Sequence, residues 1–230
     1  MIKRGAGNIE FILSFILFIS FTAAALYFFN PVRELKSGEA SRDYVINTII
    51  KNTSVDLDSY SIVINTADLS KKDFNVNIPG ISSQKNAKVV DYYGAILDSK
   101  RGGENVCFTR NNGENFSTIY LSDDIDENNG ACSGSTDYTL ASSSSNRVIS
   151  EKKVMQLREA YYANYSLLKK QLDVPEGFEF SFSLEFSNGE NITVERSGPL
   201  RGEIFSNTKI KEVLRKRGTS QFGYLTVRVW

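Results

Sequence analysis

The chain has 230 residues, with 27 basic and 27 acidic side chains, two cysteines and no histidine. This balance produces no net positive field, so we expect no nucleic-acid partner. The lack of histidine excludes histidine-based triads and histidine-containing metal sites, and the sequence holds no glycine-rich phosphate loop. We therefore expect a protein that is not an enzyme, with no catalytic residues, metal or cofactor. Carboxylate pairs of the kind used in glycoside hydrolysis are the open alternative.

The amino-terminal segment combines a basic start with a long uncharged run. Lys3 and Arg4 come first, Glu10 follows, and residues 11–29 carry no charge. As a helix this run is about 28 Å long, enough to cross the hydrocarbon core of a bilayer. Basic flanks stay in the cytoplasm, so the large carboxyl-terminal part is expected outside the cell.

A carboxylate beside such a run is costly to place in lipid, so Glu10 needs a partner. Cleavage after Gly5 would supply one, because the new amino group of Ala6 would lie one helical turn before Glu10. Between neighbouring helices the same ion pair would offset the desolvation of both charges and fix the axial register of the packed helices.

This segment resembles the class III signal peptide of type IV pilins and pilin-like proteins, the archaeal ones in particular. The match consists of the cleavage motif, the new first residue and the acidic and aromatic residues that follow: Lys3, Arg4, Gly5, Ala6, Glu10 and Phe11. The resemblance implies processing by a prepilin peptidase, and assembly with other pilin-like subunits and the pilus assembly machinery. Residues 224–230 more weakly resemble the closing strand of archaeal pilin-like membrane proteins. The large head favours a minor or specialised filament subunit.

Other kinds of amino-terminal segment share some of these features. A secretory signal peptide also begins with basic residues, and the alanines at 23–25 would suit its cleavage site. Its apolar centre, however, is usually about 7 to 15 residues long. An uncleaved anchor is the other possibility. It would make this chain a single-pass, membrane-anchored extracellular binding protein or enzyme that does not polymerise.

We divide the chain into a leader (1–5), an apolar helix that anchors and assembles (6–35), a β-rich head region (36–146) and a helix-plus-sheet part of the head (147–230). The expected fold class is α+β, with one amphipathic helix packed on the head. Pro31 marks a kink or the end of the apolar helix. Residues 33–51 mix charges with spaced apolar side chains and predict a helical stalk.

Short β-favouring runs separated by turn residues predict an antiparallel head; they are residues 60–65, 73–78, 88–97, 106–109 and 117–121. Cys107 and Cys132 are an even pair and predict one disulfide in an oxidising compartment. Two buried free thiols are the alternative. Four asparagines stand in N-x-Ser/Thr motifs and are glycosylation candidates if the head is exported: Asn52, Asn115, Asn164 and Asn191.

The stretch 121–148 is rich in polar residues and predicts an exposed loop and linker. Its alternation of Asp124, Asp126 and Asn128 is typical of a calcium loop. The glycine and glutamate that such a loop requires are replaced by Asn129 and Ser135. A solvated acidic turn is therefore the preferred interpretation.

The last third of the chain predicts a helix followed by a hairpin. Ser150 is the expected N-cap, and an apolar stripe predicts the buried face: Val154, Leu157, Tyr161, Tyr165, Leu168 and Leu172. A binding role for its tyrosines is the alternative to packing. Phenylalanines and a leucine alternate with polar residues over 178–186, Asn188 and Gly189 predict a type I′ turn into 191–196, and residues 224–230 predict a closing strand. The basic segment 209–217 fits either a helix or a strand. It predicts a solvated face, or else a surface for an anionic glycan or lipid.

Overall fold

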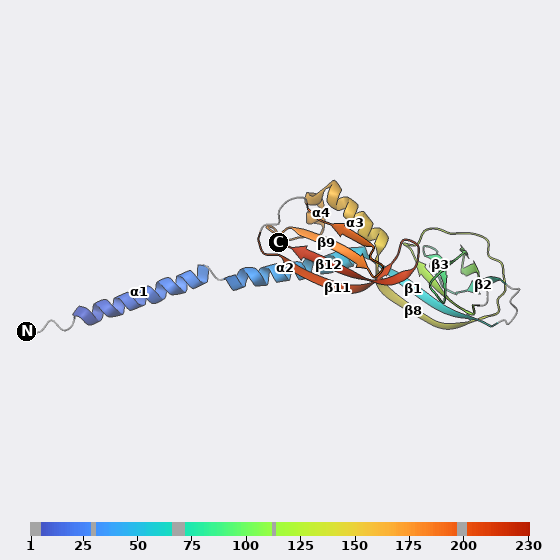
Figure 1. The fold of residues 1–230 in the computed structure, drawn as a ribbon, viewed down its shortest axis with the longest axis horizontal. Coiled ribbons are helices and arrows are strands. Elements are labelled where there is room, and N and C mark those ends of the chain that lie inside the picture. Colours follow the sequence, from blue (N-terminus) through green and yellow to red (C-terminus); the bar gives the residue numbers. More distant parts are fainter. Residues whose placement is uncertain (1–5, 29–30, 66–71, 112–113, 197–201) are drawn as a thin grey trace, which may run out of the picture.

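The computed structural model describes residues 6–28, 31–65, 72–111, 114–196 and 202–230. Within these ranges, side chains are described except at residues 6–9, 28 and 31–37. The fold is α+β, with an apolar amino-terminal helix and a β-rich head. Helix α1 (Ala6–Phe28) projects away from the head, and helix α2 (Pro31–Thr53) enters it (Figure 1). The apolar helix therefore ends where the sequence predicted a break. A second helix starts at Pro31, whose missing amide donor is tolerated at a first helical position.

The head is built on one nine-stranded sheet and one three-stranded sheet. The large sheet has the strand order β10-β9-β12-β11-β8-β1-β7-β3-β4, and the small one has the order β2-β6-β5. The strands of the first half are β1 (Ser54–Ile64), β2 (Asp73–Asn77), β3 (Asn86–Asp91), β4 (Ile96–Leu97), β5 (Ser99–Gly102), β6 (Asn105–Thr109) and β7 (Phe116–Ser122). The remaining strands are β8 (Tyr138–Ser150), β9 (Phe180–Phe186), β10 (Asn191–Val194), β11 (Phe205–Leu214) and β12 (Ser220–Val229).

The described part of the head contains three hydrophobic clusters, and the two larger ones define a proximal and a distal lobe. The proximal core lies between the helices and strands β9–β12, and the distal core lies between β1, β2, β3, β6 and β7. The long antiparallel pair β1 and β8 runs through both lobes and is paired from Ser54 with Ile149 to Ile64 with Tyr138. The chain therefore leaves the proximal lobe along β1 and returns along β8, with the distal lobe inserted between them (Figure 1).

Helix α2 joins the head through its carboxyl-terminal half. Val45, Ile46 and Ile49 are fully buried in the proximal core. Lys209 donates a hydrogen bond of 2.8 Å to Asn47, which ties the same helix to β11. Because α2 ends at Thr53 and β1 starts at Ser54, no loop separates the predicted stalk from the sheet.

The predicted amphipathic helix is two helices, α3 (Glu151–Ala163) and α4 (Tyr165–Gln171). The Ser150 hydroxyl accepts a hydrogen bond from the Lys153 amide, which confirms the predicted N-cap. Asn164 interrupts the stripe, and its side chain caps the second helix by accepting from the Leu167 amide. Most of the predicted stripe is buried on both sides of this break, so the periodicity was right although the helix is not continuous.

Strand β9 carries the predicted alternation, and its apolar face packs against α3 in the proximal core. The turn to β10 differs from the predicted type I′ turn. The Gly189 amide bonds the Phe186 carbonyl, and Gly189 has a positive φ of 84° whereas Asn188 does not. This is a three-residue loop with a bulge, because a type I′ turn needs positive φ at both central residues. The closing strand, here β12, fills the gap between β9 and β11, and Leu225, Val227 and Val229 are fully buried on one side.

Two other predictions need correction, and one open alternative is resolved. Residues 138–148 belong to strand β8 and are not a linker; their serines are exposed, but they pair with β1. The predicted strand 88–97 is a hairpin, because the Asp91 carboxylate accepts hydrogen bonds from the Tyr93 and Ala95 amides and turns the chain. The ambiguous segment 209–217 is strand β11 up to Leu214 and a turn beyond it.

We predict that Gly38→Ala destabilises the protein, although alanine normally stabilises a helix by about 1 kcal/mol relative to glycine. A Cβ atom at Gly38 would lie 2.1 Å from Cε2 of Phe205, so the added methyl group overpacks the joint between α2 and β11. We expect a loss of about 1 to 3 kcal/mol in chemical denaturation. The substitution Phe205→Leu should reduce this loss in a double-mutant cycle. Stabilisation by Gly38→Ala would contradict the packing.

A second prediction concerns Tyr161, whose hydroxyl donates a hydrogen bond of 2.8 Å to the Phe180 carbonyl. Burial raises the pKa of this hydroxyl to about 12, from about 10 in the unfolded chain. The native state therefore holds the Tyr161 proton more tightly than the unfolded chain does. The stability that this protonated hydroxyl contributes is full below pH 10 and is lost as the pH rises toward 12.

The substitution Tyr161→Phe should cost about 1 to 1.5 kcal/mol at neutral pH and reduce the alkaline loss of stability. Urea denaturation at several pH values measures both effects. Tyr162→Phe is the control, because the Tyr162 side chain is 59% exposed. Equal effects of the two substitutions would show that Tyr161 has no special role.

Candidate functional site: the amino-terminal helix

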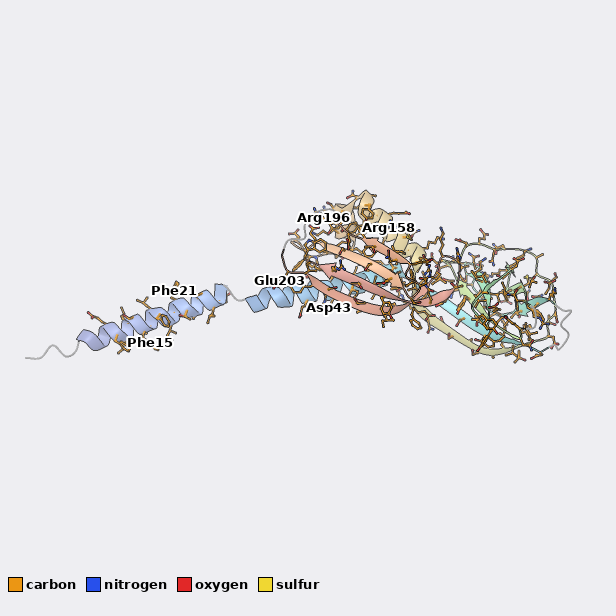
Figure 2. All side chains as sticks on the ribbon, viewed as in Figure 1. Phe15, Phe21, Asp43, Arg158, Arg196 and Glu203 are labelled. Carbon is orange, nitrogen blue, oxygen red and sulfur yellow. A yellow bond between two sulfur atoms is a disulfide. The ribbon has the colours of Figure 1, made fainter. Side chains whose placement is uncertain are left out.

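Helix α1 presents apolar side chains in every direction and packs against nothing in the described part of the chain. Its window Glu10–Tyr27 has a mean hydropathy of 1.9 and is 0% buried. Phe11 is 74% exposed, and Phe15 and Phe21 project outward from the helix (Figure 2). The 23 residues of α1 span about 34 Å. This helix is therefore long and apolar enough to cross a membrane.

The polar groups of α1 are few. Thr22 satisfies its hydroxyl within the helix by donating to the Phe18 carbonyl at 2.8 Å, an arrangement compatible with a lipid environment. Glu10 is the only charged residue of the window, and its side chain is exposed. No described side chain pairs with it.

The predicted processing residues are only partly described. Lys3, Arg4 and Gly5 lie outside the described residues. Ala6 is the first residue of α1 and stands one helical turn before Glu10, the spacing that places both on one helix face. The proposed bond to be cleaved therefore directly precedes the helix as the structure describes it.

The disulfide and the glycosylation candidates belong to the head. Cys107 and Cys132 form the predicted bond, with Cα atoms 5.4 Å apart, which ties β6 to the segment before β8. All four sequon asparagines are exposed. The side chains of two of them also hold the fold: Asn115 accepts from Arg110, and Asn164 caps α4.

The acidic segment before Cys132 connects parts of the head. Asp124 accepts a hydrogen bond from Ser150, and Asp126 pairs with Lys152 at 3.6 Å. Asn128 donates to the carbonyls of Ala87 and Ser99. These side chains thus have separate protein partners, and the described residues contain no group of three or more acidic or cysteine side chains suited to a metal.

The two tyrosines of the predicted stripe, Tyr161 in α3 and Tyr165 in α4, belong to the proximal core or pack against it. The Tyr165 hydroxyl accepts a hydrogen bond from the Phe180 amide at 3.0 Å, and burial raises its pKa. Burial opposes ionisation of the neighbouring Glu179, but hydrogen bonds from Tyr165 and Lys169 outweigh it and lower the pKa of that carboxyl. This cluster joins the start of β9 to the helices, as the packing interpretation predicted.

A charged depression of about 570 Å³ on the proximal lobe is a feature that the sequence did not locate. It lies between the start of α3, the β9–β10 hairpin and the turn from β11 to β12. Its cationic residues are Arg158, Arg215, Lys216 and Arg217. The basic run 209–217 contains three of these four cations, but Arg158 comes from a different element, and no local pattern marks it.

Comparison with known proteins found no matching family model, and no match among curated proteins or solved structures. The functional argument therefore rests on the residues of this chain.

The disulfide gives a direct test of the distal lobe. In protein from an oxidising compartment, peptide mapping without reduction should recover the Cys107 and Cys132 peptides as one linked pair. Replacing both cysteines by alanine should lower the free energy of unfolding by about 3 kcal/mol, the value expected for closing a loop of this length. Alkylation of both thiols without prior reduction would contradict the bond.

Proposed function

We propose that this chain is a pilin-like subunit, minor or specialised, of an archaeal type IV pilus-like filament on the cell surface. A prepilin peptidase removes residues 1–5, and the chain then assembles through its amino-terminal helix. The observation that supports this most is α1, an apolar helix that is 0% buried and has one carboxylate at its entrance. Such a surface requires lipid or other helices around it.

Assembly accounts for the two unusual properties of α1 together. Before assembly the membrane covers its apolar surface; in a filament the same surface packs against the α1 helices of neighbouring subunits. Glu10 then pairs with the amino group of Ala6 on an adjacent helix. This ion pair forms in an apolar bundle, where an unpaired charge is costly, so it selects one axial register among many.

The head would remain outside the cell, where its disulfide is stable. The direct passage from α2 into β1 supports a role in which the head is held at a fixed orientation to the stalk helix α2. The partners of the chain would be the prepilin peptidase, the pilus assembly machinery, other pilin-like subunits and membrane lipid.

Processing is tested by intact-mass and amino-terminal analysis of the protein purified from membranes of its native host. We expect a chain that starts at Ala6. A secretory signal sequence would also be apolar and amino-terminal, but its removal would leave a chain starting near Leu26. A chain that retains Met1 would indicate a static anchor.

Assembly is tested by Glu10→Gln, which removes the charge and keeps the size of the side chain. We expect normal membrane insertion and at least a tenfold loss of subunit from the sheared filament fraction, because breaking a buried ion pair costs about 3 kcal/mol or more. Glu39→Gln is the matched control, since Glu39 is an exposed carboxylate on α2. Wild-type incorporation of the Glu10 variant would refute the pairing and favour an anchored protein that does not polymerise.

A further inference from the structure

We propose that the charged depression on the proximal lobe binds an acidic saccharide. This site is independent of α1 and of filament assembly, so its test does not depend on the outcome for Glu10. The depression has a volume of about 570 Å³, within the range of small-ligand sites, roughly 300 to 1,000 Å³.

The centre of the site is a fixed arginine. The Arg215 guanidinium lies over the Phe186 ring, 3.8 Å from its centroid, and its Nε donates to Glu151 at 2.9 Å. A second ion pair joins it to Glu190, whose pKa this contact lowers. The Lys216 amide also donates to Glu151, at 2.8 Å, so both carboxylates of the depression are already engaged.

The other cations of the depression are not neutralised in this way. Within the described part of the chain, the side chains of Arg158 and Lys216 form no hydrogen bond or ion pair. The charge of Arg217 helps to lower the pKa of Glu190, but Arg217 also forms no hydrogen bond or ion pair with a described residue. Four cations therefore face two carboxylates, and the depression has a surplus of positive charge. An arginine fork matches the two oxygens of a carboxylate or sulfate group.

Two lining residues also have a donor nitrogen that is covered by protein and has no hydrogen-bond partner among the described residues: Arg215 Nη1 and Gln221 Nε2. Leaving a buried donor unpaired is unfavourable. Both groups can only donate, so an oxygen-rich ligand is what would satisfy them after a small side-chain adjustment.

The remaining walls fit a sugar better than a bare anion. The lining combines amide and hydroxyl side chains suited to sugar hydroxyl groups with apolar ones suited to the C–H face of a ring; they are Asn188, Asn191, Thr219, Gln221, Met155 and Ile192. Asn191 is also a sequon asparagine with an exposed side chain, so the acidic sugar has two possible sources, a free saccharide or a glycan attached at Asn191 itself.

A lipid headgroup is a poor fit for the position of the site. Glu151 begins α3 directly after Ser150, and the β1–β8 pairing places this point beside Ser54, just beyond the end of α2. Helix α2 has 23 residues and is about 34 Å long, which separates the depression from a membrane that holds α1. Figure 2 shows Arg158 on α3, on the head and away from the apolar helix.

The test measures binding of pentagalacturonate to the full chain in detergent, made in a host without N-glycosylation. We expect Arg158→Gln and Arg217→Gln each to weaken binding about tenfold, the effect of losing one charged hydrogen bond. Both variants should keep the wild-type melting temperature, because neither side chain forms a hydrogen bond or ion pair among the described residues. Lys170→Gln removes the same charge from α4, outside the depression, and should bind like the wild type.

Three results would overturn the proposal: equal binding of the uncharged maltopentaose, no effect of the two arginine substitutions, or equally tight binding of penta-aspartate. The last would indicate a site for anions in general or for acidic peptides. Protein purified from the native host distinguishes the two possible sources of the acidic sugar, a free saccharide and a glycan attached at Asn191. If an attached glycan fills the depression, Thr193→Ala, which removes the sequon but keeps Asn191, should restore binding of added pentagalacturonate. If the ligand is free saccharide, wild type and variant should bind it equally.

Discussion

The burial of Val45, Ile46 and Ile49 is the contact on which the arrangement of the molecule depends. These side chains are fully buried in the proximal core, where α2 packs against β11, β12 and α3. A helix of this kind has little stability by itself in water, because most helical stability in proteins comes from packing of the apolar face. The proximal core therefore does two things at once. It completes the head, and it holds the stalk in one orientation to the sheet.

The same core explains why the charged depression has a fixed shape. Arg215 follows directly after Val213 and Leu214, which are buried, and Phe186 ends a strand whose apolar face lies in that core. Glu151 begins a helix capped by Ser150. Two of the groups that position the arginine, Phe186 and Glu151, thus come from the ends of elements packed in the proximal core. The cations around it, by contrast, extend from the surface and are not engaged by the fold.

Local patterns predicted the parts of the structure that have a strong period or an unambiguous end. The apolar run, the Ser150 cap, the alternation in β9 and the closing strand were all readable, because each follows from a few neighbouring residues. Strand β8 was not, since its serines have low β propensity and are exposed; pairing with β1, distant in sequence, makes them a strand. The break at Asn164 was missed because the apolar period continues across it. The proposed assembly through Glu10 depends on contacts between copies of the chain. Neither the apolar periodicity of the sequence nor the fold of a single copy determines those contacts.

The insertion of the distal lobe between β1 and β8 has a mechanical consequence. A pull applied to the distal lobe while α1 is held would pass from β1 straight into α2, because no loop lies between them. The pairing of β1 with β8 extends from Ser54 to Ile64 along the direction of that pull. Its hydrogen bonds would then be loaded together in shear, and they would not open one after another as in unzipping. Force at the tip is thus shared over the whole length of the two strands before it reaches the stalk.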